Sequence, residues 1–418
     1  MPLLRHITPD ELCAARREPF EAETLAGAET IMRDVRERGW SAALAHARRL
    51  GDLPPGEAAF FEPADLRRAL EALGPEDRGV LERTAARIET FARAQRACLA
   101  PLDLAIPGGR AGHTLAPVER AGCYAPGGRY PLPSSVLMTA LTARAAGVRE
   151  VWAASPRPAP ITLAAAALAG CDGLLAIGGA QAVGVLAYGA GPVLACDLIA
   201  GPGNAWVTAA KHIASRTRGI DMLAGPSEVL IIADASADPA LIASDLLAQA
   251  EHDDDARPVL ITTDPSLHAR VEAELERQLA TLPTAPTARA ALRNGFVTLA
   301  RDTTHAAQLS DAIAPEHLEL HTRDADDLAR RVNHYGAVFI GPRAAEVLGD
   351  YGAGPNHVLP TGGIARACGG LSVLTFLRVR TFLSIEAPVP ELIADAAALG
   401  RSEGLEAHAR AAEARLEG

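Results

Sequence analysis

The chain has 418 residues, more than one hydrophobic core usually fills, so two or more lobes are expected. Hydrophobic residues make up 49% of it and aromatic residues only 4%, which is typical of an α/β enzyme with alanine-rich helices. The formal net charge of −11 argues against nucleic acid and anionic membranes as main partners, because both favour a basic protein surface.

Three further features predict a cytoplasmic protein with reduced thiols. The six cysteines contain no Cys-x-x-Cys pair, so neither a thiolate zinc site nor a disulfide framework is indicated. Charged residues interrupt the first twelve positions, which therefore lack the apolar run of a signal peptide. Residues 173–196 carry no charge, but glycines at 178, 179, 189 and 191 divide them into pieces too short to span a membrane.

The hydrophobic pattern predicts two α/β lobes. The first 120 residues are predicted to be mostly helical, with helices at about 24–37, 63–73 and 76–98. Strands at 150–154, 173–177 and 193–199 alternate with helices at about 134–146, 161–169 and 180–188, which predicts a parallel, Rossmann-like sheet. Buried strands at 229–235, 258–263 and 338–340 predict a second lobe. Two helices, at about 390–399 and 402–416, end the chain.

These elements predict the following domain organisation. Residues 1–18 form an N-terminal arm, and residues 19–123 together with 229–370 form the main lobe, which carries the metal and catalytic residues. Residues 124–228 form a Rossmann-like lobe inserted into the main lobe. Residues 371–418 form a helical tail, which is too small for a core of its own and must dock on another surface.

A helix starting after Asp238 brings together possible metal ligands. Asp238 can cap this helix and Pro239 is tolerated in its first turn. Gln249 and His252 then lie three residues apart on one face, at the border of the core. Such a spacing suits a metal site, although a polar last turn with a capping histidine is the simpler interpretation. Residues 314–319 and 349–357 add Glu316, His317, Asp350 and His357, whose donors suit zinc or a similar divalent ion.

The adjacent pair Glu316 and His317 predicts acid-base catalysis. Oxidation of an alcohol needs a base for the hydroxyl proton, and a histidine with a pKa near 6.5 suits this role at neutral pH. We assign it to His317. If an aldehyde product stays bound, Glu316 can activate the water for a second oxidation. Neighbouring strand residues point to opposite faces, so both side chains reach one site only if Pro315 forms a turn or helix start.

Eight short motifs in a fixed order resemble the histidinol dehydrogenase family, over about residues 124–408. They are Tyr124-Ala125-Pro126-Gly127-Gly128, Ser134-Ser135-Val136-Leu137-Met138, Gly178-Gly179-Ala180-Gln181-Ala182, Gly201-Pro202-Gly203-Asn204, Ala224-Gly225-Pro226-Ser227-Glu228, Gln249 to His252, Pro315-Glu316-His317-Leu318 and Asn356-His357-Val358-Leu359-Pro360-Thr361. Each motif alone is weak, but together they are highly specific.

The resemblance implies oxidation of L-histidinol to L-histidine through L-histidinal, with two NAD⁺ used in succession and one Zn²⁺ per subunit. It implies NAD contacts from Tyr124, Gln181 and Asn204, and zinc ligands Gln249, His252, Asp350 and His408. The substrate contacts it implies are Ser227, Gln249, His252, His317, Asp350, His357, Glu403 and His408. It also implies a homodimer in which each site borrows His408 and Glu403 from the exchanged tail of the partner chain.

Other readings remain open at this point. The Gly-x-Gly-x-x-Gly fingerprint of dinucleotide sites is missing, so the NAD site rests on the resemblance and on glycine turns at strand ends. A related zinc- and NAD-dependent enzyme could oxidise another small polar alcohol, such as a sulfonated diol. Cys123 could instead form a covalent thiohemiacetal, although no base is evident beside it. A third alternative is a metal-binding module without catalysis.

Overall fold

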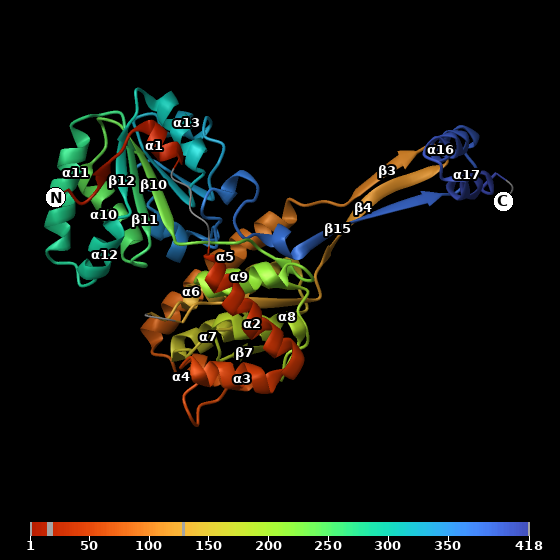
Figure 1. The fold of residues 1–418 in the computed structure, drawn as a ribbon, viewed down its shortest axis with the longest axis horizontal. Helices are drawn as coiled ribbons and strands as arrows, with labels where there is room; N and C mark the ends of the chain where they lie inside the picture. The colour runs from red at the N-terminus through yellow and green to blue at the C-terminus, as the bar shows by residue number, and fades with distance from the viewer. Residues whose placement is uncertain (1, 15–19, 128–129, 417–418) are drawn as a thin grey trace. The chain divides into compact units, whose positions relative to one another are not determined.

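The computed structural model describes residues 2–14, 20–127 and 130–416. Part of the predicted N-terminal arm, residues 15–18, and Gly128 of the first motif lie outside these ranges. Contacts divide the chain into two units, Met1–Arg96 with Val118–Phe376 and Ala97–Pro117 with Leu377–Gly418 (Figure 1).

The first unit contains two mostly parallel sheets, which confirms the predicted α/β class. Sheet A is parallel throughout and has the order β1-β12-β11-β10-β13-β14. Its strands are β1 (Arg5–His6), β12 (Phe296–Leu299), β11 (Arg257–Thr262), β10 (Glu228–Ala233), β13 (His317–His321) and β14 (Ala337–Ile340). Strands β10 and β11 are buried on both faces, which explains their nearly continuous apolar sequences.

Helices cover both faces of sheet A. One core joins Val229 and Ile231 of β10 to α10 (Pro239–Ala250), α11 (Leu267–Leu279) and α12 (Ala285–Leu292). The other joins Leu318 and Leu320 of β13 to α1 (Pro9–Ala14), α13 (Thr303–Ile313) and α14 (Ala325–Ala329). Because strand residues alternate between faces, the odd-numbered residues of β13 face α10.

Sheet B has the order β2-β7-β6-β5-β8-β9, and within it only β2 runs antiparallel to its neighbour. Its strands are β2 (Phe60–Phe61), β7 (Gly173–Leu175), β6 (Glu150–Ala154), β5 (Arg120–Tyr124), β8 (Leu198–Ala200) and β9 (Gly219–Ile220). The connecting helices are α6 (Pro133–Ala146), α7 (Pro160–Leu168), α8 (Gly179–Tyr188) and α9 (Ala205–Ala214). The uncharged run at 173–196 is thus β7, α8 and a loop.

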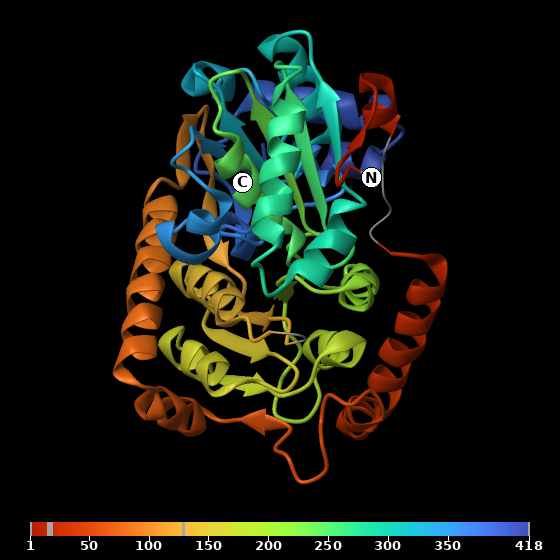
Figure 2. The ribbon, with the colours of Figure 1, turned by 90° about the vertical axis from the view of Figure 1, so that its left-hand side faces the viewer.

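The early helices pack on the sheet B lobe, whereas we expected them in the lobe with the metal and catalytic residues. Helix α2 (Ala22–Arg38) contacts α8 and α9, α3 (Trp40–Arg49) contacts α8, and α4 (Pro63–Ala72) contacts α7. Figure 2 shows α2 and α3, in red, beside the yellow-green helices of this lobe. Ile31, Met32 and Val35 of α2 are buried in its core, so burial of this apolar face decides the placement.

The second unit combines a three-stranded antiparallel sheet with two helices. Strands β3 (Leu102–Ile106) and β4 (Gly109–Pro117) form a hairpin, and β15 (Leu377–Ile385) pairs with β4. The predicted terminal helices are α16 (Pro390–Ser402) and α17 (Glu406–Glu413), which pack on each other at one end of the sheet (Figure 1). Only Ala397, Gly400 and Ala409 are buried in these two helices. The sheet itself was not predicted.

Among the described residues, none forms a helix that combines the length and the apolar character needed to cross a membrane.

Candidate active site

The end of α10 places Gln249 and His252 at the amino-terminal edge of sheet A. Asp238 caps the helix by accepting a hydrogen bond from the Ala240 N–H at 2.8 Å, as predicted. The helix ends at Ala250, so Gln249 lies in its last turn and is fully buried. His252 follows in a turn closed by its own N–H, which donates to the Gln249 carbonyl at 3.3 Å, and its side chain is exposed.

Glu316 and His317 meet at the start of β13, because the chain turns just before the strand. Ala314 adopts a left-handed conformation (φ 54°), and the strand begins only at His317. Glu316 Oε2 accepts a hydrogen bond from the Glu228 N–H at 2.8 Å, while His317 Nδ1 lies 3.1 Å from the Glu228 carbonyl oxygen. The backbone of Glu228 therefore holds both side chains, and Glu316 Oε2 lies 3.7 Å from His317 Nδ1.

The hydrogen bond to Glu228 fixes the tautomer of neutral His317. A carbonyl oxygen only accepts, so Nδ1 carries the proton. Nε2 is then the free acceptor of the neutral ring, and in the described ranges no residue forms a hydrogen bond with this buried nitrogen. This nitrogen faces Asp350, whose Oδ1 lies 3.6 Å away. His317 thus presents an unengaged basic nitrogen to the group of possible metal ligands.

A short helical segment brings Asp350 and an unpredicted carboxylate, Glu346, to the same place. The segment comprises α15 (Glu346–Leu348) and a π-helical turn (Gly349–Ala353), and the carbonyl of Tyr351 accepts a hydrogen bond from Thr84 of α5 (Pro75–Ala97) at 3.3 Å. Ligand atoms of His252, Glu346 and Asp350 all lie within 4.8 Å of one another. The four-residue spacing of Glu346 and Asp350 is the signal that could have identified Glu346.

Glu346 also contacts the other predicted residues. Its Oε1 lies 3.7 Å from His317 Nδ1. With the Gln249 amide oriented so that its nitrogen donates, this nitrogen lies 3.2 and 3.3 Å from the two carboxylate oxygens of Glu346. The structure therefore gathers Gln249, His252, Asp350, Glu316 and His317 around Glu346.

Burial and crowded charge shift the pKa values of this group. Burial raises the pKa of Glu316 to about 8 and raises that of Glu346 well above its ordinary value. Burial opposes the charged form of His317, but Glu346, Glu316 and Asp350 outweigh it and raise its pKa. For Asp350, burial is outweighed by His317 and nearby imidazoles, so its pKa is lowered. Three carboxyl groups are thus crowded into one buried site, and a bound cation would favour their charged forms.

His357 connects the two lobes beside this group. Its Nδ1 donates to the Asp350 carbonyl at 3.1 Å, and its Nε2 lies 3.3 Å from Ser135 Oγ in α6. The preceding Asn356 donates to the Met138 carbonyl of α6 at 2.9 Å. Ser227 precedes β10 directly, at the edge where Glu316 and His317 lie.

The three predicted NAD residues gather at the carboxyl edge of sheet B. Tyr124 ends β5, Gln181 lies in the first turn of α8, and Asn204 caps α9. The Tyr124 hydroxyl accepts a hydrogen bond from the Gly179 N–H at 3.2 Å, and Gln181 Nε2 donates to Asp52 at 2.8 Å. Strands β5 and β8 meet where the strand order reverses, the usual ligand position in open α/β sheets.

A buried ion pair holds the glycine turn before Asn204. Lys211 and Asp221 pair in the interior, Lys211 Nζ donates to the Gly201 carbonyl at 2.9 Å, and the Gly201 N–H donates to Asp221 at 2.7 Å. Gly201 has φ 122°, and a Cβ there would lie 1.9 Å from the Tyr124 carbonyl oxygen. Only glycine permits this approach between the turn and β5.

Cys123 does not have the environment of a catalytic thiolate. Its side chain is fully buried in β5, and burial raises the pKa of its thiol to about 12. A covalent thiohemiacetal needs an accessible thiolate, so the structure argues against this alternative.

Glu403 and His408 belong to the second unit, where both are exposed on the α16–α17 pair. The metal role of His408 and the substrate role of Glu403 stay predictions.

Comparisons with known proteins show to which family the chain is similar. The family model described as histidinol dehydrogenase matches residues 14–416. A histidinol dehydrogenase of Thermus thermophilus is 46% identical over 400 residues, covering 95% of this chain and 95% of that protein. One of Dechloromonas aromatica is 42% identical over 413 residues, covering 95% and 94%. The crystal structure of histidinol dehydrogenase from Elizabethkingia anophelis matches with a TM-score of 0.92 at 29% identity, covering 100% of this chain and 99% of that one. The chain therefore belongs to the histidinol dehydrogenase family.

Proposed function

We propose that this protein oxidises L-histidinol through L-histidinal to L-histidine and reduces two NAD⁺ in succession. The observation that carries the proposal is the pair Glu316 and His317, held on the backbone of Glu228 beside Gln249, His252 and Asp350. One site thus offers two different bases, as two successive oxidations require.

His317 takes the hydroxyl proton in the first oxidation. Its Nδ1 is engaged by Glu228, so the proton goes to Nε2, which has no hydrogen-bond partner among the residues that the structure describes. Glu316 takes a proton from water in the second oxidation, when the aldehyde becomes a hydrate. Its raised pKa makes its carboxylate a stronger base than an ordinary glutamate. NAD, when bound, accepts the hydride in each step.

The donor set fits a divalent cation. Gln249, His252 and Asp350 would hold a zinc ion, with His408 of the partner subunit as the fourth protein ligand. The close approach of His252, Glu346 and Asp350 ligand atoms supports this assignment, and Glu346 is a further possible donor. When bound, the ion would orient the amine and imidazole of the substrate and offset the negative charge that raises the pKa of His317.

We assign the dinucleotide to the carboxyl edge of sheet B, with contacts from Tyr124, Gln181 and Asn204. Their position where the strand order reverses supports this site. Substrate contacts would come from Ser227 and His357, and from Glu403 of the partner subunit, whose carboxylate suits an ammonium group. A cytoplasmic location stays a prediction.

The second unit supports a homodimer with exchanged tails. Large apolar side chains on its strands and helices are exposed, and its helix pair buries only small residues. The exposed apolar side chains include Leu102, Leu104, Val379, Leu383, Leu392 and Leu399. Such a surface needs a partner, and a second copy of this chain can offer one by exchanging the same element.

A substrate panel tests the proposed reaction. L-Histidinol should reduce NAD⁺ efficiently, whereas small diols, including sulfonated ones, should be turned over poorly. A preference for a sulfonated diol would favour the related dehydrogenase, and no turnover of either class would overturn the proposal.

A further inference from the structure

Strand β13 carries three polar side chains on a buried face. His317, Glu319 and His321 alternate with Leu318 and Leu320, and every residue of the strand is buried. A parallel strand covered on both faces normally has apolar residues on each, because buried polar groups must find partners. His317 is explained by the candidate active site, but Glu319 and His321 are not.

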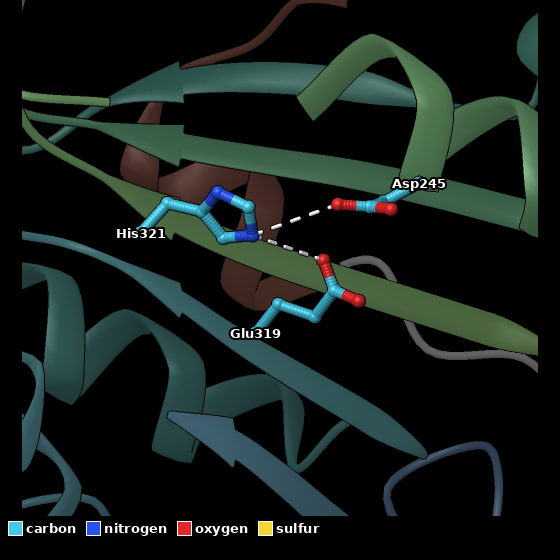
Figure 3. A group of neighbouring side chains, drawn as sticks. All are labelled: Asp245, Glu319 and His321. Atoms are coloured by element: carbon cyan, nitrogen blue, oxygen red, sulfur yellow. Dashed lines mark ion pairs between the residues drawn. The ribbon is translucent and has the colours of Figure 1, made fainter. Parts of the chain in front are cut away.

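Helix α10 adds a third polar group to these two. Asp245 lies one turn before Gln249 on the same helix face, and its carboxylate meets Glu319 and His321, as Figure 3 shows. His321 Nε2 lies 3.3 Å from Glu319 Oε2 and 3.6 Å from Asp245 Oδ2. The exposed fractions are 7% for Asp245, 0% for Glu319 and 3% for His321. We call these three residues the α10–β13 cluster.

The spacing in this cluster matches metal ligands better than hydrogen bonds. A tetrahedral site with nitrogen and oxygen ligands at about 2.0–2.2 Å has ligand-to-ligand separations of about 3.3–3.6 Å. Hydrogen bonds between nitrogen and oxygen are about 2.7–3.2 Å long. Both separations from His321 Nε2 lie in the first range.

Unsatisfied polarity is a second, independent observation. Glu319 Oε2 is completely buried and faces His321 Nε2, and no residue in the described part of the chain forms a hydrogen bond with it. Within the described part of the chain, Asp245 and Glu319 form ion pairs with His321 and with no lysine or arginine, and burial together with Glu319 raises the pKa of Asp245 to about 7. A buried carboxylate without compensating charge is costly, and a cation between the three side chains would remove that cost.

We propose that the α10–β13 cluster binds a divalent transition-metal cation of the zinc or manganese type, separate from the candidate active site. Asp245, Glu319 and His321 each supply one ligand atom, and a water molecule completes the coordination. The cation ties α10 to β13. The second oxygen of Glu319 accepts a hydrogen bond from the Glu346 N–H at 2.7 Å, so the same cation also steadies the segment that carries Glu346 and Asp350.

Metal content tests the proposal once the candidate active site has been disabled. The full-length variant His252→Gln, Asp350→Asn is loaded with zinc or manganese, gel-filtered and analysed for metal per chain. We expect about one equivalent to remain, and added metal to raise the melting temperature. Substitution by cobalt should give visible absorption bands of a low-symmetry site. Adding the substitution Glu319→Gln to this variant should abolish the retained metal, the rise in melting temperature and the cobalt bands. The glutamine keeps an acceptor for the Glu346 N–H.

Glu272→Gln in the same background is the matched control. Glu272 also accepts hydrogen bonds from backbone N–H groups, those of Leu3 and Leu4. It belongs neither to the α10–β13 cluster nor to the candidate active site, so the metal should be retained. The proposal is overturned if the folded background variant keeps no metal and shows no metal-dependent melting shift. It is also overturned if Glu319→Gln leaves metal content unchanged. Because His252 and Asp350, two of the proposed active-site ligands, are replaced throughout, neither result depends on the proposed function.

Discussion

His317 Nε2 lies 3.6 Å from Asp350 Oδ1, which places the proposed base of the first oxidation next to a proposed metal ligand. Asp350 reaches this position from a π-helical turn supported by α5, and His317 from the first residue of β13. One small substrate can therefore contact both groups.

Substitutions of the two adjacent bases should impair different half-reactions. We expect His317→Ala to lower the rate of L-histidinol oxidation by about 10²–10⁴-fold, the usual contribution of a positioned base. Glu316→Gln should mainly impair oxidation of supplied L-histidinal, because only that step needs activated water. Single-turnover NADH formation from each substrate measures both effects. Equal losses in both half-reactions for both variants would refute this division of labour.

The pH dependence of the second step should report Glu316. Burial raises its pKa to about 8, and a base acts only when deprotonated, so the rate of L-histidinal oxidation should rise with pH and level off above 8. The rise should be about tenfold per pH unit well below that value. Stopped-flow measurements between pH 6 and 9.5 test this expectation, and Glu316→Gln should lose the rise. A flat wild-type profile would count against Glu316 as the base.

Metal removal should abolish activity. Gln249, His252 and Asp350 are the proposed ligands of the cation in this chain, and without the cation the substrate's amine and imidazole would lose their anchor. Dialysis against a strong chelator should inactivate the protein, and zinc should restore it. Elemental analysis supplies the control, since full activity in a metal-free sample would exclude the requirement.

Complementation should show whether the tail acts on the neighbouring chain. A mixture of His408→Ala and His317→Ala chains, unfolded and refolded together, forms mixed dimers. If the tail works on the partner, one site in each mixed dimer combines an intact core with an intact tail, and partial activity returns. Each variant refolded alone is the control. If mixed dimers form but activity does not return, His408 contributes to the site of its own chain.

Local signals in the sequence were sufficient for most of the first unit. The Asp238 cap and Pro239 predicted the start of α10, and continuous apolar runs predicted β10 and β11. The adjacent Glu316 and His317 predicted the proposed catalytic pair, although their common reach depends on the left-handed conformation of Ala314, which no local signal indicated.

Long-range packing was harder to predict. Pairing of β15 with β4 joins residues about 260 positions apart, and the exposed strand 377–385 gave no buried run to mark it. The placement of α2 depends on which apolar surface covers Ile31 and Met32, which periodicity alone cannot specify. Glu346 was missed although it lies four residues before Asp350, and Glu319 was missed although it lies two residues before His321. In each case the residue that completes the group, His252 or Asp245, comes from another part of the chain.

The most direct test of this account is the stoichiometry of NAD⁺ reduction. The purified protein with limiting L-histidinol and excess NAD⁺ should form two NADH per molecule of L-histidinol, with L-histidine as the product and no free L-histidinal. One NADH per molecule with L-histidinal accumulating, or no NADH at all, would contradict a four-electron oxidation at the Glu316 and His317 site.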